Sequence, residues 1–191
     1  MRRHNRMLYR AARSILKDDS EAEDAVQEAY LRAYRAIERF RGDAKLSTWL
    51  VRIVVNEALG RLRRRSRGAE IALQLDEAAD ASQAAPEQPE RAAQRAQQRR
   101  IVEREIDALP DVMRTVFVLR ALEEMSVEEV AAALGIPAAT VRTRFFRARH
   151  ALRAALSGEN DLSPADCFAF DGARCDGIVA AVLARLRRAP E

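Results

Sequence analysis

Cysteine and histidine are scarce in this chain, which has two of each among its 191 residues. Cys167 and Cys175, with only His4 and His150 elsewhere, do not make a convincing four-ligand zinc site. Two histidines also leave little material for general-base catalysis. We therefore expect no bound metal and no cofactor, and we expect both thiols to be reduced and partly buried rather than redox-active.

Aromatic residues are also few, at 5% of the chain, and sustained alternation of apolar and polar residues is almost absent. This absence argues against β-strands, whose side chains alternate between two faces. Alanine, leucine and arginine abound instead, and apolar residues recur at helical spacing. The sequence predicts an all-α protein built of two small helical domains joined by a flexible linker.

No long apolar run with a charged leader opens the chain, and no stretch is apolar enough to predict a spanning helix. We therefore expect a cytoplasmic protein with no membrane insertion. A glycine loop of phosphate-binding spacing is also missing. Ser14 and Lys17 have the spacing of an acyl-enzyme dyad, but they lie in a helical pattern without partner motifs. An enzyme is therefore not predicted, and no residue is assigned a catalytic role.

Charge is unevenly distributed along the chain, although the net charge is only +4. Residues 1–66 carry 16 basic and 9 acidic groups, and residues 99–156 carry 10 and 8. Between these blocks, residues 67–98 carry 3 basic and 6 acidic groups. The two basic blocks permit a nucleic acid or an anionic surface as the partner without requiring either.

Composition divides the chain into four parts. Residues 67–91 contain Pro86 and Pro89 and show little helical periodicity, so we predict a linker there. This leaves a first module over residues 1–66, a second over 92–156 and a C-terminal extension over 157–191. In the extension, residues 177–186 are predicted to form a short helix that docks through one apolar face. That face comprises Ile178, Val179, Val182, Leu183 and Leu186.

Three helices are predicted in the first module. Ser20 followed by Glu23 forms a capping box that would open the second helix, and Gly42 suits the left-handed residue after its end. Ser47 is predicted to cap the third helix, which ends in a cluster of arginines. The apolar positions are Leu8, Ala12, Ile15 and Leu16 in the first helix, and Val26, Ala29, Ala33, Ile37 and Phe40 in the second.

A helix-turn-helix is predicted between Ser126 and Leu156. Ser126 and Glu129 form a capping box, Gly135 would end that short helix, and the next helix would begin beside Pro137. Two helices joined by such a tight turn commonly place the second helix in the major groove of DNA. Upstream, a helix starting near Pro110 would carry a buried stripe comprising Val112, Val116, Leu119 and Leu122.

The second helix of this motif is basic and has no acidic residue. Its buried face is predicted to comprise Val141, Phe145, Ala148 and Leu152. A solvated basic surface would explain an isolated charge run, but the capped helix and glycine turn favour DNA binding. Arginine can pair with guanine, and threonine or phenylalanine can touch a thymine methyl. The candidate DNA-binding residues here are Thr140, Arg142, Thr143, Arg144, Phe146, Arg147 and His150.

Taken together, the motifs resemble those of extracytoplasmic-function sigma factors, small bacterial initiation factors with two helical domains joined by a linker. The resemblance covers nearly the whole chain, and the order and spacing of the motifs make it specific. It rests on residues 22–28 (AEDAVQE), on Trp49, Leu50, Arg52, Ile53 and Asn56, and on Leu109, Pro110, Glu128, Glu129, Val130, Ala131, Thr140, Val141, Arg142, Arg144, Arg147, Ala148 and Arg149.

The resemblance implies that the protein binds core RNA polymerase and directs it to promoter DNA. The first module would read the minus-ten element, where a base leaves the stack, and the second would read the minus-thirty-five element. An anti-sigma factor is a further implied partner. The implied polymerase-binding residues are Asp24, Gln27, Glu28 and Leu31, which are predicted to project away from the core.

The minus-ten element would meet the loop over residues 41–46 and the helix that follows it. The residues implied there are Ser47, Thr48, Arg52 and Asn56, while Arg61, Arg63 and Arg64 would contact phosphates. Trp49 is expected to belong to the core rather than to stack on a base. Flexible chain of about 24 residues averages roughly 27 Å and reaches roughly 80 Å when extended. The linker would therefore span two promoter elements only when stretched, and a free factor should be more compact.

The sequence departs from the family pattern at two turns. Ala139 and Glu124 stand where family members usually have glycine. The extension carries a motif that resembles an appendage of one subset of the family, and we interpret it as regulatory or as a packing element. This motif comprises Phe168, Phe170, Gly172, Arg174, Cys175 and Asp176. The alternative to a sigma factor is a two-domain helix-turn-helix regulator that binds DNA without polymerase.

Overall fold

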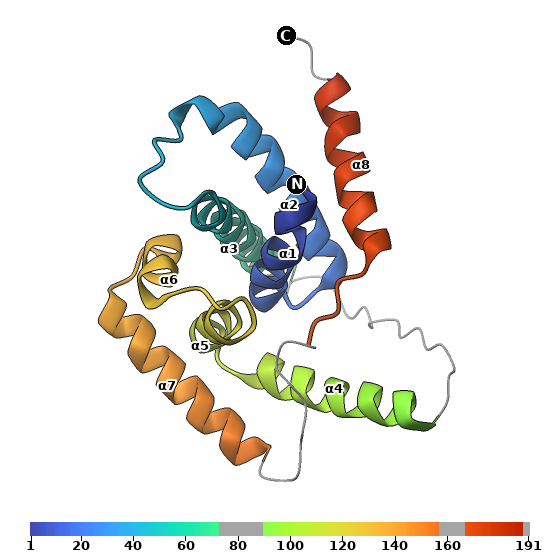
Figure 1. The fold of residues 1–191 in the computed structure, drawn as a ribbon, viewed down its shortest axis with the longest axis vertical. Coiled ribbons are helices and arrows are strands. Elements are labelled where there is room, and N and C mark those ends of the chain that lie inside the picture. Colours follow the sequence, from blue (N-terminus) through green and yellow to red (C-terminus); the bar gives the residue numbers. More distant parts are fainter. Residues whose placement is uncertain (73–89, 157–166, 189–191) are drawn as a thin grey trace.

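The computed structural model describes residues 1–72, 90–156 and 167–188, and every regular element in these ranges is a helix (Figure 1). The predicted all-α class is therefore confirmed. None of the helices in this part of the chain combines the length and the apolar character needed to cross a membrane.

Helices α1 (Arg2–Leu16), α2 (Asp19–Ala36) and α3 (Leu46–Ala72) pack against one another as the first module. Many of the facing side chains are alanine and valine, which let the helices approach closely. The positions fully excluded from solvent include Leu8, Ala12, Val26, Ala29, Val51 and Val54. The apolar periodicity of α1 and of the first half of α2 therefore identified the core.

The start of α2 differs from the predicted capping box. Asp18 is the N-cap, because its carboxylate accepts the backbone N–H of Glu21 at 2.7 Å. Lys17 takes a left-handed conformation (φ 57°) that ends α1, so the chain is ready to begin a new helix at once. Ser20 lies inside the first turn, and the predicted Ser20 cap is wrong.

The connection between α2 and α3 also corrects two predictions. The chain tightens into a 3-10 turn, η1 (Ile37–Arg39), which rotates Ile37 out of the buried stripe and leaves it 49% exposed. Gly42 takes the predicted left-handed conformation at φ 77°. The carbonyl of Lys45 accepts the N–H of Trp49, so α3 begins before Ser47, which does not cap it.

Helices α4 (Glu90–Ala108), α5 (Asp111–Phe117), α6 (Val127–Leu134) and α7 (Ala138–Ala155) form the second module. A π-helical turn, η2 (Val118–Leu122), continues α5. Val116, Leu119 and Leu122 are buried as predicted, whereas Val112 is 51% exposed. Val112 differs because it lies in the first turn of α5, where it lines a groove between the modules.

The two modules pack directly on each other, since α3 contacts α6 while α1 contacts α5 and η2. One continuous core holds Val54 and Val55 of the first module together with Val116 and Val130 of the second. α3 also runs past the predicted end of the first module, and α4 begins inside the predicted linker. The rest of that linker, residues 73–89, lies outside the described residues.

Arg114 forms hydrogen bonds across this interface. Its side chain is fully buried, and its guanidinium donates to the carbonyl of Ser14 in the last turns of α1. It also donates to the carbonyls of Asp107 and Leu109, at 3.0 and 2.9 Å. Buried carbonyls are costly to leave without donors, so Arg114 fixes the end of α1 against the turn before α5.

Two ion pairs join α1 to the second module. Arg10 of α1 pairs with Glu123 at 2.9 Å, and neither side chain is more than 5% exposed. Arg13 donates to both carboxylate oxygens of Asp107, at 3.2 and 2.9 Å. The apolar core and these charged contacts together hold the two modules in one compact arrangement.

The C-terminal extension folds back onto both modules. Cys167 and Phe168 are buried in the core of the second module, and the predicted helix is present as α8 (Gly172–Arg188), packed on α2 and α1 (Figure 1). Ile178 and Val182 are buried, which confirms docking through the predicted face, although Leu183 is 40% exposed. Both cysteines are free thiols.

Candidate nucleic-acid interface

The helix-turn-helix is built as the sequence predicts. The hydroxyl of Ser126 accepts the N–H of Glu129 at 3.0 Å, and the Glu129 carboxylate accepts the N–H of Ser126 at 2.7 Å. Gly135 ends α6 at φ 65°, and Pro137 is the N-cap of α7. The turn therefore fixes the direction in which α7 leaves the module.

Helix α7 presents a polar face to solvent. Val141, Ala148 and Leu152 anchor its other face in the core. Phe146 is 70% exposed, which is unusual for a large aromatic side chain unless a binding partner covers it. The exposed candidates are Arg142, Thr143, Phe146, Arg147 and His150, whereas Thr140 and Arg144 are half-buried. Arg142, Phe146 and His150 line one groove, whereas Arg144 lines the separate groove between the modules, so the seven predicted residues do not share one face.

A basic groove of about 480 Å³ runs beside that face. The guanidinium groups of Arg120 and Arg149 lie 5.4 and 5.8 Å from the centre of the Phe145 ring. His150 and Arg153 also line the groove. Stacking on an aromatic ring orients an arginine without neutralising its charge, so the groove keeps a positive potential that suits phosphate groups. Arg120 and Arg149 were not among the predicted site residues.

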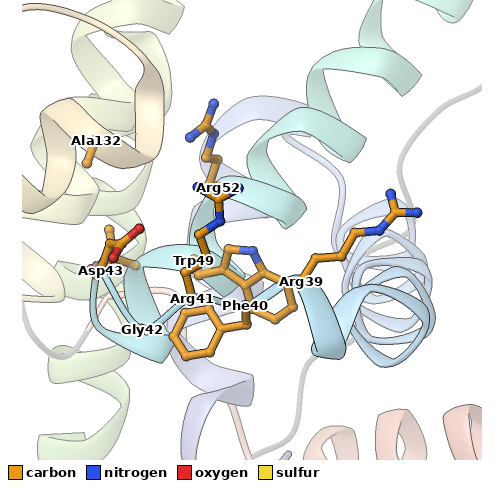
Figure 2. A pocket seen from close by; sticks show the side chains of 10 residues that line it. Arg39, Phe40, Arg41, Gly42, Asp43, Trp49, Arg52 and Ala132 are labelled. Atoms are coloured by element: carbon orange, nitrogen blue, oxygen red, sulfur yellow. The ribbon is translucent and has the colours of Figure 1, made fainter.

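A pocket of about 230 Å³ lies between η1 and the start of α3, over the predicted minus-ten loop (Figure 2). The rings of Phe40 and Trp49 form one wall, with centroids 5.1 Å apart at an interplanar angle of 42°. Arg39, Arg41 and Arg52 add positive charge around it. An aromatic wall with surrounding arginines is a typical site for an unstacked base.

Thr48 is the unusual polar residue of this pocket. Its side chain lines the pocket and is only 3% exposed, yet its hydroxyl has no hydrogen-bond partner among the described residues. Trp49 was predicted to be core, and it does pack against the core while also forming the pocket wall. Phe40 was assigned to the core stripe alone, since one sequence cannot show that η1 turns it toward Trp49.

The remaining minus-ten candidates lie along α3. Arg52 and Asn56 are exposed, and Ser47 is half-buried. Further along, Glu57 is buried and binds the predicted phosphate contact Arg61 at 2.8 Å, with Arg64 at 3.6 Å. Arg63 is exposed. A buried carboxylate thus holds part of the basic run in place. The i,i+4 spacing of Glu57 and Arg61 is the sequence signal for this pair.

The predicted polymerase-binding residues of α2 are less accessible than expected. Asp24 has a 60% exposed side chain and Gln27 is half-buried, but Leu31 is only 3% exposed. Glu28 pairs with Arg185 of α8 at 2.9 Å. Burial alone would raise the pKa of Glu28, but hydrogen bonds from Arg185 and Arg32 outweigh it, so the pKa is lowered.

Helix α6 of the second module closes on the minus-ten pocket of the first. Ala132 lines the pocket from the opposite side (Figure 2). Lys45 also pairs with Glu129 at 2.8 Å. This hydrogen bond from Lys45, followed by that from the Ser126 N–H, lowers the pKa of Glu129. The first helix of the helix-turn-helix therefore contacts the predicted minus-ten pocket in this structure.

Comparison with known proteins assigns both modules. The Sigma-70 region 2 family matches residues 1–68, and the Sigma-70 region 4 family matches residues 99–152. The RNA polymerase sigma-H factor of Pseudomonas aeruginosa is 40% identical over 147 residues, covering 74% of this chain and 76% of the relative. The ECF RNA polymerase sigma-E factor of Escherichia coli K12 is 41% identical over 134 residues, covering 68% and 70%. The chain belongs to the extracytoplasmic-function sigma factor family.

Solved structures agree with this sigma factor assignment. CnrH, in complex with the cytosolic domain of CnrY, shares 30% identity at a TM-score of 0.54, over 83% of this chain and 85% of CnrH. RpoE of Bartonella quintana, in complex with the anti-sigma factor NepR, shares the fold at a TM-score of 0.65. That match has 23% identity and covers 81% of this chain and 92% of RpoE. The sigma factor interpretation is confirmed, and the stand-alone regulator is not favoured.

Proposed function

We propose that this sigma factor binds core RNA polymerase through the outer face of α2 and reads promoter DNA with α7 and with the Trp49 pocket. One observation carries the proposal: this chain contains both region 2 and region 4, and each region has an exposed basic surface. The protein would act in the cytoplasm, and the chemistry of RNA synthesis would belong to polymerase rather than to this chain.

Helix α7 would lie in the major groove at the minus-thirty-five element. Arg142 and Arg147 are exposed and can reach base edges, and Thr143 and Phe146 can contact thymine methyl groups. Arg142 is held only weakly, at 3.5 Å from the exposed carboxylate of Glu128. Such a contact between exposed side chains contributes little, so Arg142 is free to change partner.

The Trp49 pocket would take a base that leaves the stack at the minus-ten element. Stacking on an aromatic ring contributes about 1–3 kcal/mol per base, which offsets an unstacking cost of a few kcal/mol. The hydroxyl of Thr48 is buried in the compact form, so it would supply a polar contact to the base only once α6 leaves the pocket. Exposed Arg52 and Asn56 would contact the adjoining strand. Arg61, Arg63 and Arg64 would bind phosphates.

The compact arrangement would be the polymerase-free state. Promoter elements one to two duplex turns apart are separated by about 35 to 70 Å, whereas α3 and α6 are in contact here. The modules must therefore separate before both elements are bound. An anti-sigma partner of the kind named for RpoE would act by holding the modules in a form that cannot span a promoter.

A binding comparison separates this function from that of a stand-alone regulator. We expect nanomolar association with purified core polymerase and weak, non-specific binding to duplex DNA when polymerase is absent. Tight binding to one operator without polymerase, together with no association with core enzyme, would contradict the proposal.

Two arginines of α7 provide a matched pair of variants for the assembled holoenzyme. Arg147→Ala should cost about 1–3 kcal/mol at particular base pairs and relax specificity there. Arg153→Ala removes the same charge from the far end of the helix, and it should weaken binding to all sequences alike. Equal loss of specificity in both variants would argue against base reading by Arg147.

A further inference from the structure

Helix α8 runs along α2 in the same direction. Near the start of α8, Arg174 binds Asp19 at 2.9 Å and lies 3.5 Å from Glu23. Near its end, Arg185 binds Glu28 at 2.9 Å. These pairs join the beginning of each helix and then their later turns, so α8 lies beside α2 from Asp19 to Glu28, in the first half of α2 (Figure 1).

The burial of Leu31 shows which face of α2 is covered. Successive residues of a helix are rotated by about 100°, which places Leu31 opposite the core positions Val26 and Ala33. A side chain on that outer face would normally be exposed, yet Leu31 is only 3% exposed. Besides α1, α3 and the adjoining turn η1, α8 is the element in the described residues with substantial contacts to α2.

Apolar packing supports this cover. Ile178 and Val182 are 0% and 1% exposed and belong to the same core as Leu31. Around Cys175, the amide of Asn5 donates to the backbone carbonyl at 3.3 Å and to the sulfur at 3.2 Å. α8 is thus held by a buried face as well as by ion pairs, which makes the contact specific.

A separate anchor holds the chain just before α8. The N–H of Phe168 donates to Glu103 of α4 at 2.6 Å, while its carbonyl accepts from Arg10 of α1, in the first module, at 3.2 Å. Cys167 beside it is buried in the second module. The extension can therefore remain attached to the second module while α8 leaves α2.

From these contacts we infer that α8 is an autoinhibitory cover, which occupies the polymerase-binding face of α2 in the free protein and must leave before docking. The inference rests on the proposed function, because it takes Glu28 and Leu31 as polymerase contacts. Glu28 cannot pair with Arg185 and with polymerase at once, and Leu31 is inaccessible until α8 moves. Separation of the modules would pull the anchored extension and favour this release.

A single charge placed on the buried face of α8 tests the inference in the full-length protein. Val182→Asp should undock α8, since a carboxylate at this position would have to be buried. When the competent state is only a small fraction, apparent affinity rises as that fraction increases, so we expect binding to core polymerase to tighten by about tenfold or more. Ala180→Asp places the same charge on the exposed face and should leave the affinity unchanged.

Alkylation of Cys175 reports whether α8 has undocked. The thiol is half-buried beside Asn5, so its labelling, located by mass spectrometry, should be faster in Val182→Asp than in wild type or Ala180→Asp. Arg185→Ala serves if Val182→Asp does not fold, and it should tighten polymerase binding by a smaller factor. An undocked α8 with unchanged or weaker binding would overturn the inference while leaving the proposed function intact. Failure of every variant, wild type included, to bind core polymerase would overturn both.

Discussion

The ion pair between Arg10 and Glu123 allows the contact between the modules to be measured. The two groups are 2.9 Å apart and almost fully buried, at 4% and 5% exposure. Removing one partner of such a pair costs about 3–5 kcal/mol, because the other charge loses its counter-ion in a dry site. Separation of the modules would return the remaining charge to water, so either single variant should open the compact form.

The expected size of the change follows from this energy. About 3–5 kcal/mol corresponds to roughly two to four orders of magnitude in the equilibrium between compact and open forms. Small-angle scattering should show a larger radius of gyration for Glu123→Leu and for Arg10→Met than for wild type. Glu38→Leu makes the same change at an exposed position and should leave the radius unchanged.

A double-mutant cycle completes the test. Arg10→Met with Glu123→Leu removes both charges, a replacement that is often neutral or stabilising. The bond from Arg10 to the Phe168 carbonyl is lost in Arg10→Met and in the double variant alike. The double variant should therefore be more compact and more stable to urea than Arg10→Met. If the two single losses simply added, or if neither variant opened, the pair would not hold the modules together and the reasoning would be refuted.

Three further predictions concern local features. Glu124 has a left-handed conformation (φ 52°), so Glu124→Gly should raise the free energy of unfolding by about 1 kcal/mol in urea, and a loss would contradict this. Thr48→Val should keep or slightly improve stability, because it removes a buried hydroxyl that has no hydrogen-bond partner among the described residues. The same variant should reduce promoter melting several-fold. A clear loss of stability would show that the hydroxyl has a partner. The pKa values of Asp19 and Glu28 are lowered because hydrogen bonds from arginines outweigh burial. The ionised carboxylates therefore stabilise the fold fully above the ordinary pKa values of 3.8 and 4.5, and this stabilisation is lost as pH falls below them. Urea unfolding should therefore show stability declining in this acid range, and a constant stability would argue against these bonds.

The helix-turn-helix was predictable because its signals are local. Ser126 and Glu129 lie one helical turn apart, and Gly135 supplies the left-handed residue, so a few neighbouring residues specify the whole motif. The start of α2 was harder to predict because two local signals compete there. Asp18 with Glu21 and Ser20 with Glu23 have the same capping spacing, and only the left-handed Lys17 selects the first.

Contacts between distant residues were not predictable from one sequence. The apolar face of α8 predicted docking, but nothing in its spacing indicated α2 as the partner. The Arg10–Glu123 pair and the buried Arg114 likewise join segments whose pairing has no local signal. Leu31 shows the consequence, since its place outside the core stripe predicted exposure, whereas it is buried in one core with Ile178 and Val182 of α8.

Transcription on fragmented genomic DNA tests the central claim most directly. Core polymerase with this protein should give a defined set of RNA 5′ ends that core polymerase alone does not give. The corresponding promoters should share two sequence elements one to two duplex turns apart, and Arg147→Ala should weaken the requirement for the upstream one. An identical set of 5′ ends with and without the protein would contradict the account.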